Sequence, residues 1–187
     1  MKGFVAVLLA VICFSSCSLK YDSEVSAEDV NPEFVFYETK MTRYENNKKT
    51  AEVYADQLEE YKNSDIAYAK NVTFKTFDNK QENDTEGFCG LLYADTANDI
   101  YELYDGIRLF SKKNDAVFRA NILRWNAASE QLTSGRTDMV RIEKDGTAIV
   151  GSGFSASGVS GKYYFTGSVS GSIETENKKE GESEKTE

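Results

Sequence analysis

The sequence predicts an all-β domain, and three observations support this prediction. Apolar and polar residues alternate with a period of two through most of the chain, as expected for strands that bury one face. Short turn signals rich in Asn, Asp and Gly separate these runs. The runs recur at roughly 10 to 15 residues, a spacing that favours short antiparallel strands arranged as a sandwich, barrel or roll.

Four segments carry the alternation most clearly. Their apolar positions are Ile66, Tyr68, Val72 and Phe74; Leu103, Ile107 and Leu109; Val140 and Ile142; and Tyr163, Phe165, Val169 and Ile173. Turn signals stand between them at Asn46-Asn47, Asp78-Asn79, residues 113–115, Asp145-Gly146 and residues 158–161. The Asp145-Gly146 pair predicts a two-residue hairpin, because both residues tolerate the positive φ that such a turn requires.

The segment from Thr50 to Lys62 fits two structures. Ala51, Tyr54, Leu58 and Tyr61 recur at helical spacing, and the segment is rich in residues that favour helix. A strand with a bulge before Leu58 fits equally well, so the pattern leaves both open. Short strand motifs also recur weakly at about 35 residues, as a ladder of similar strand pairs would produce.

The two ends of the chain differ from its centre. Residues 1–16 read as a secretory signal peptide, with Lys2, an apolar stretch and small residues before Cys17. A lipoprotein would be cut before Cys17 and acylated on it. An uncleaved membrane anchor is the alternative, but about 12 apolar residues fall short of the roughly 20 that span a bilayer.

The rest of the chain divides by composition. Residues 17–32 are polar and predict a flexible tether, residues 33–173 form the domain, and residues 174–187 read as a disordered acidic tail.

Composition excludes several kinds of function. The formal net charge of −9 argues against a nucleic-acid partner and against a domain that lies flat on anionic lipid. The chain has no histidine, the commonest general base and zinc ligand. We therefore expect no catalytic residue, metal or cofactor, although a carboxylate pair for hydrolysis stays open because its members need not be close in sequence. Cys89 reads as a small buried hydrophobic residue.

Residues 118–156 resemble the LptC family, the periplasmic component C of the lipopolysaccharide transport machine. The matching pattern is Leu123-x-Trp125, Gln131-Leu132-x-Ser134, Val140-x-Ile142, Gly146 and Ile149-x-Gly151-x-Gly153-Phe154. Residues 52–74 are similar to the first repeat of that family, and residues 168–173 resemble its last strand.

The resemblance implies an open, twisted antiparallel β-jellyroll with an apolar interior groove that holds the acyl chains of a glycolipid. It further implies relay of that lipid from the membrane subunits of an ABC transporter to an LptA-like bridge protein or a second β-jellyroll. The domain would lie in the periplasm, held to a membrane by lipidated Cys17, with the inner membrane favoured over the outer. A structural or host-facing surface lipoprotein with a closed β-sandwich is the alternative.

Two sets of residues follow from this resemblance. The predicted groove lining, which would look the same in an ordinary closed core, is Val72, Phe74, Leu103, Ile107, Leu109, Phe118, Ile122, Leu123, Trp125, Val140, Ile142, Phe154, Phe165 and Val169. The predicted docking edge is a single last strand from Tyr163 to Ile173, represented by Tyr163, Tyr164, Phe165, Thr166, Ser168 and Ser170.

Overall fold

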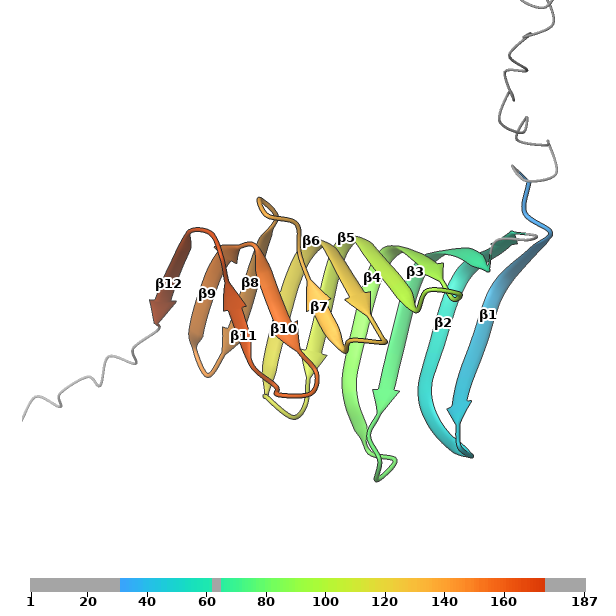
Figure 1. Cartoon of the computed structure of the whole chain (residues 1–187), viewed down its shortest axis with the longest axis horizontal. Coiled ribbons are helices and arrows are strands. Elements are labelled where there is room, and N and C mark those ends of the chain that lie inside the picture. The colour runs from blue at the N-terminus through green and yellow to red at the C-terminus, as the bar shows by residue number, and fades with distance from the viewer. Residues whose placement is uncertain (1–30, 62–64, 174–187) are drawn as a thin grey trace, which may run out of the picture. The chain divides into compact units, whose positions relative to one another are not determined.

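The computed structural model describes residues 31–61 and 65–173, and the regular elements in these residues are all β-strands (Figure 1). They are β1 (Phe34–Glu45), β2 (Lys48–Tyr61), β3 (Ile66–Phe77), β4 (Asn83–Asp95), β5 (Ile100–Ser111), β6 (Ala116–Asn126), β7 (Gln131–Thr133), β8 (Met139–Lys144), β9 (Thr147–Ser152), β10 (Phe154–Ser157), β11 (Tyr163–Phe165) and β12 (Val169–Ile173). The predicted all-β fold is confirmed.

Several predictions concern residues outside the described part of the chain. These are the signal peptide at 1–16, the lipidated Cys17, the tether up to residue 30 and the acidic tail at 174–187. Within the described residues, no helix is long and apolar enough to cross a membrane.

The strands form one antiparallel sheet that branches at β6. Strands β1 to β6 pair in chain order, so each is joined to the next as a hairpin. One end of β6 pairs with β7 through Arg124–Asn126, and the other pairs with β8 through Val117–Ala120. Two branches follow, β7-β10-β11 and β8-β9-β12, and the strands of both are labelled in Figure 1.

A line of bends crosses the six long strands and folds the sheet on itself. The pairing register brings the bend residues next to one another, one from each of β1 to β6: Glu38, Asp56, Asn71, Gly90, Asp105 and Asn121. Glu38, Asn71 and Asp105 have positive φ, an uncommon conformation for residues other than glycine. We call this row the bend line.

Local contacts and extra residues explain why the strands turn here. The Asn71 side-chain amide donates a hydrogen bond of 2.9 Å to the Asp56 carboxylate, which joins β3 to β2 at the bend. On β5, Asp105 and Gly106 together face the single residue Asn121 of β6, which is a β-bulge. Bulges bend a strand and increase its twist. Gly106 also has positive φ.

The bend line divides the sheet into two layers. Each layer contains one half of every long strand, β1 to β6, together with three short strands. The first layer contains residues 34–37, 57–61, 66–70, 91–95, 100–104 and 122–126 with β7, β10 and β11. The second layer contains residues 39–45, 48–55, 72–77, 83–89, 107–111 and 116–120 with β8, β9 and β12. Phe118 of the second layer contacts Phe154 of the first, with ring centroids 5.9 Å apart, so the layers face each other. We call the space between them the interior.

Two sequence predictions can be compared directly with this fold. The Asp145-Gly146 hairpin joins β8 to β9, both of its residues have positive φ, and the prediction is confirmed. The ambiguous segment from Thr50 to Lys62 is strand β2 through Tyr61, so its helical interpretation was wrong. The bend explains the ambiguity, because Val53, Ala55 and Leu58 all pack in the core although the last two are three residues apart.

Candidate functional site

The two layers share the apolar surface of the interior, and most of the predicted lining residues face it. A single buried cluster contains Val72, Leu103, Ile107, Leu109, Phe118, Leu123, Val140, Ile142 and Phe154, and the partly buried Phe74 and Phe165 pack against it. The fold therefore gathers these residues from six strands and two layers into one place.

Three predicted lining residues lie outside this cluster. Ile122 is 40% exposed and stands opposite Tyr104 on the outer face, because its neighbour Leu123 points into the core. Trp125 is partly buried near the rim of the first layer, where its ring approaches Gly158. Val169 lies on the last strand of the second layer and is 55% exposed.

Aromatic rings fill the end of the interior that is formed by β6, β10 and β11. Phe154 lies at the centre, with ring centroids 5.9 Å from Phe118, 6.2 Å from Tyr163 and 5.5 Å from Phe165. The Phe165 ring extends from the first layer over Gly151 of the second, 2.7 Å from where a Cβ would stand. The two layers are thus packed tightly together at this end.

Beside the larger Met41, Val53, Leu58 and Leu92, the other end of the interior, between β1 and β4, carries several small side chains. They include Ala51, Ala55, Ala67, Ala69, Ala94 and Gly87, and the Phe74 ring occupies the place of the missing Gly87 side chain. On edge strand β1, Phe36 stands opposite the buried Leu58, and its ring stacks on Phe34 at 6.1 Å. Phe34 and Phe36 remain 51% and 43% exposed.

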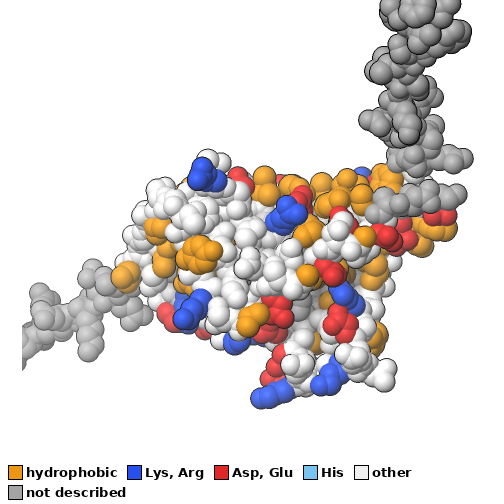
Figure 2. Space-filling model, in the orientation of Figure 1, with side chains coloured by type: hydrophobic (Ala, Val, Ile, Leu, Met, Phe, Trp, Pro, Cys, Tyr) orange, Lys and Arg blue, Asp and Glu red, His pale blue; other side chains and the backbone are white. Residues whose placement is uncertain are grey.

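The predicted lining did not include these two phenylalanines. Hydrophobic side chains can be followed along the upper edge of the domain to its β1 end in Figure 2. The apolar run Phe34–Tyr37, which follows Pro32 and Glu33, was the sequence signal that could have identified them.

The interior becomes polar toward its rim. In the second layer, a row far from the bend line contains Arg43, Ala51, Thr76, Thr85 and Ser111 in direct register. Arg43 donates a hydrogen bond of 3.1 Å to the hydroxyl of Tyr101, which belongs to the first layer, four strands away within the sheet. The interior is thus apolar near the bend line, where the buried core side chains lie, and polar at its rim. This arrangement suits an amphiphile.

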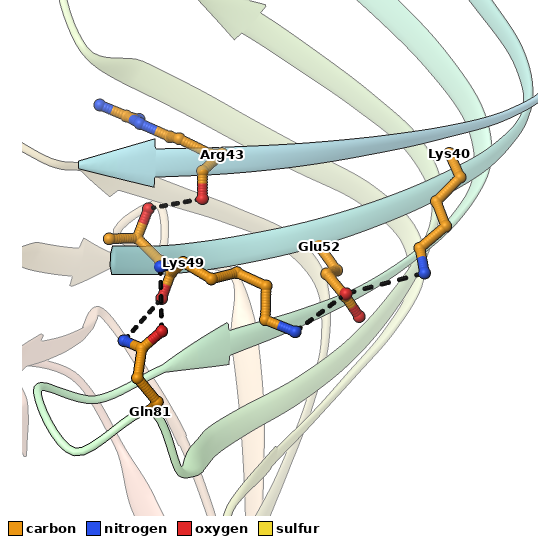
Figure 3. A network of polar contacts seen from close by, with 6 residues as sticks. Lys40, Arg43, Lys49, Glu52 and Gln81 are labelled. Atoms are coloured by element: carbon orange, nitrogen blue, oxygen red, sulfur yellow. Dashed lines mark hydrogen bonds and ion pairs between the residues drawn. The ribbon is translucent and has the colours of Figure 1, made fainter. Parts of the chain in front are cut away.

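Polar contacts hold edge strand β1 in place. Glu52 of β2 accepts from Lys49 at 3.0 Å and pairs with Lys40 of β1 at 3.7 Å, as Figure 3 shows. The Gln81 side chain bonds the backbone of Lys49, and Thr50 donates to the backbone oxygen of Arg43 (Figure 3). These contacts join β1 to β2, and β2 to the turn between β3 and β4.

The opposite end of the sheet has two edges, and this corrects the predicted docking edge. Residues 163–173 form not one strand but β11 in the first layer and β12 in the second. Thr166 and Gly167 donate backbone hydrogen bonds to Gly153 and Ser152, so the chain turns between the layers here. Tyr163, Tyr164 and Phe165 lie on β11, Ser170 lies on β12, and Thr166 and Ser168 lie in the turn between them.

The described residues contain neither a candidate metal cluster nor an exposed thiol. No group of three His, Cys, Asp or Glu side chains in residues 31–61 and 65–173 could hold a metal ion. Cys89 is fully buried, as its sequence context predicted, and burial raises the pKa of its thiol to about 12. A thiol with so high a pKa is protonated at neutral pH and is a poor nucleophile.

Comparison with known proteins identifies the family. The model of a family described as lipopolysaccharide-assembly, LptC-related, matches residues 4–174. The chain belongs to this LptC-related family. An uncharacterized protein of Treponema pallidum (strain Nichols) is 23% identical over 166 residues, covering 88% of this LptC-related chain and 83% of the relative.

A solved structure shares the fold of this LptC-related chain. It is LptH, the LptA homologous periplasmic component of the lipopolysaccharide transport device of Pseudomonas aeruginosa. The match has a TM-score of 0.52 and 12% identity, and covers 67% of this chain and 95% of LptH. At this identity the match concerns the fold alone, and it confirms the predicted open jellyroll.

Proposed function

We propose that this protein binds the acyl chains of a glycolipid of the lipopolysaccharide class between its two layers and relays the lipid to the next β-domain. The observation that carries the proposal is the polarity gradient of the interior, from apolar side chains near the bend line to hydroxyls and Arg43 at the rim. Acyl chains gain about 0.8 kcal/mol for each buried CH₂ group. The sugars would stay at the rim in water.

The two ends of the interior differ in how they would take part. At the β1 end, the exposed Phe34 and Phe36 on the edge strand offer apolar contacts to an incoming acyl chain, beside several small side chains. At the far end of the interior, the rings around Phe154 instead pack the two layers against each other. We therefore expect lipid to enter the interior at the β1 end.

Backbone edges are the proposed contacts with partners. Strand β1 would receive the lipid from the membrane subunits of an ABC transporter, and β11 and β12 would pass it to an LptA-like bridge protein or a second jellyroll. Unpaired strand edges recruit other strands through backbone hydrogen bonds. Membership of an assembly family favours this relay over the carboxylate hydrolase and over a closed surface lipoprotein.

We further propose that the domain lies in the periplasm and is anchored to a membrane through acylated Cys17. The support is the order of Lys2, an apolar stretch, Ser15-Ser16 and Cys17. A Cys17→Ser chain should leave the membrane fraction while its domain stays folded, because acyl chains provide the attachment. Continued membrane association of that variant would point to an uncleaved apolar anchor.

The proposed lipid site predicts the effect of a charge at Phe36. Phe36→Asp should lower lipid recovery by about tenfold, because a carboxylate must be desolvated when an acyl chain covers it. The protein should stay folded, since Phe36 is 43% exposed. Lipid that copurifies with the chain can be quantified by mass spectrometry.

Tyr37→Asp is the matched control for this experiment. Tyr37 follows Phe36 on the same strand, points to the other face and is 71% exposed. It should bind lipid like the unchanged chain. Equal lipid content in the two variants, with both folded, would argue against the interior as the lipid site.

A further inference from the structure

A row of basic and aromatic side chains crosses the outer face of the second layer. The pairing register aligns Lys40, Tyr54, Thr73, Phe88, Arg108, Arg119 and Arg141, one from each of β1 to β6 and β8. The neighbours of the arginines in sequence, such as Ile107, Phe118 and Val140, are buried, so the arginines point outward. We call these seven residues the arginine row.

Three arginines directly opposite one another are unfavourable for the sheet alone. Arg108 faces Arg119, and Arg119 faces Arg141, on strands about 4.8 Å apart. Like charges in such cross-strand pairs repel. Glu143 compensates two of them, at 2.7 Å from Arg141 and 3.3 Å from Arg119. Within the described residues Arg108 forms no ion pair, so the row keeps an excess of positive charge.

This local charge differs from the charge of the whole molecule. The chain carries a net charge of −9, yet no acidic residue stands in the row from Lys40 to Arg141. Exposed aromatic rings continue the row, since Phe88 is 39% and Tyr54 is 41% exposed. Basic side chains beside aromatic rings are typical of protein surfaces that lie at the interface of a membrane.

We propose that the arginine row docks on anionic phospholipid headgroups of the membrane to which the protein is attached. Guanidinium groups bind phosphate oxygens with two parallel hydrogen bonds, and Phe88 and Tyr54 would insert among the headgroups. The second layer would then face the membrane, whereas the first layer faces away from it.

This orientation fits the rest of the molecule. The row itself has no acidic residue, and Glu52, Glu86 and Glu143, two residues away on the same face, are each ion-paired with Lys or Arg side chains. The sequence argument against a flat position on anionic lipid uses the average charge and does not describe the row. The inference rests on the proposed membrane attachment, but it does not depend on lipid in the interior, because the row occupies the opposite face of the second layer.

Photo-crosslinking of the full chain in membranes tests the proposal. The chain is reconstituted by its own anchor into vesicles of phosphatidylcholine with phosphatidylglycerol, with p-benzoylphenylalanine at Phe88 or, as a control, at Tyr68. These side chains are 39% and 37% exposed, and they lie on the outer faces of the second and first layers. We expect phosphatidylglycerol adducts at Phe88, at a yield about tenfold above that at Tyr68.

Arginine variants test whether the lipid adducts at Phe88 depend on the positive charge of the row. Replacing Arg108, Arg119 and Arg141 by Gln should lower the Phe88 adducts by at least about tenfold, because each basic side chain near an anionic surface contributes about fivefold. Replacement by Lys should largely preserve the adducts. Arg124→Gln, on the outer face of the first layer, should have no effect.

Three results would overturn the proposal. They are equal lipid adducts at Phe88 and Tyr68, adducts that do not respond to loss of the three arginines, and Phe88 adducts with residues 174–187 of the chain itself. The last result would assign the row to the acidic tail. None of these results would affect the outcome of the Phe36→Asp experiment, so failure of this proposal and failure of the lipid relay can be told apart.

Discussion

Phe154→Ala should destabilise the domain by about 3 to 5 kcal/mol, a large part of the 5 to 15 kcal/mol that typically holds a domain together. Phe154 is 1% exposed and its ring contacts Phe118, Tyr163 and Phe165. Its removal would leave a cavity where the two layers meet, and the backbone, held by Ser134, could close it only in part. Urea denaturation followed by circular dichroism measures the change.

Phe34→Ala provides the comparison. Phe34 is 51% exposed on edge strand β1, so its truncation should cost less than about 1 kcal/mol. Similar losses for the two variants would mean that the rings around Phe154 do not brace the layers.

Gly171→Pro should weaken binding of a bridge partner by about tenfold or more while the domain stays folded. The Ser152 N–H donates to the Ser168 oxygen, and ladder bonds in antiparallel pairs alternate. Residues 170 and 172 therefore bond β9, and the N–H of Gly171 faces the open side of β12. Proline removes this outward donor and places its ring in the path of an incoming strand, a device that natural edge strands use.

Gly171→Ala separates this effect from the loss of glycine. A Cβ at residue 171 would lie 3.4 Å from the Ala148 oxygen, an ordinary contact, and alanine keeps the N–H. Binding of an LptA-like partner, measured by biolayer interferometry, should be unchanged in this variant. If Gly171→Pro binds as well as Gly171→Ala, docking uses β11 or β1 instead.

The strands were predictable because each layer buries one face. Alternation identified the segments around Val72, Leu103, Val140 and Phe165, and the turn residues identified the hairpin at Asp145-Gly146. These are local signals, and they survive in any arrangement of the sheet.

The bend line was not predictable, because it shifts the phase of the alternation. Ala69 and Val72 both pack in the core although they are three residues apart on either side of Asn71. The same shift at Asn121 explains Ile122. Alternation from Phe118 and Ala120 predicts that Ile122 faces inward, but the bend brings Leu123 inward instead.

The functional surfaces depended on long-range register. Phe34 and Phe36 matter because β1 is an edge, and the arginine row exists because residues from seven strands align. No local sequence pattern predicts the edge position of β1 or the alignment of the arginine row. The family resemblance predicted the jellyroll, but not the split of residues 163–173 between two layers.

The central claim is that glycolipid acyl chains occupy the space between the layers. Photo-crosslinking in living cells tests it most directly, with p-benzoylphenylalanine at Phe74 inside or at Tyr68 outside, both on β3. The account predicts glycolipid adducts, detected by mass spectrometry, at Phe74 and none at Tyr68. Absence of glycolipid at Phe74 in a folded chain, or equal capture at the two positions, would contradict it.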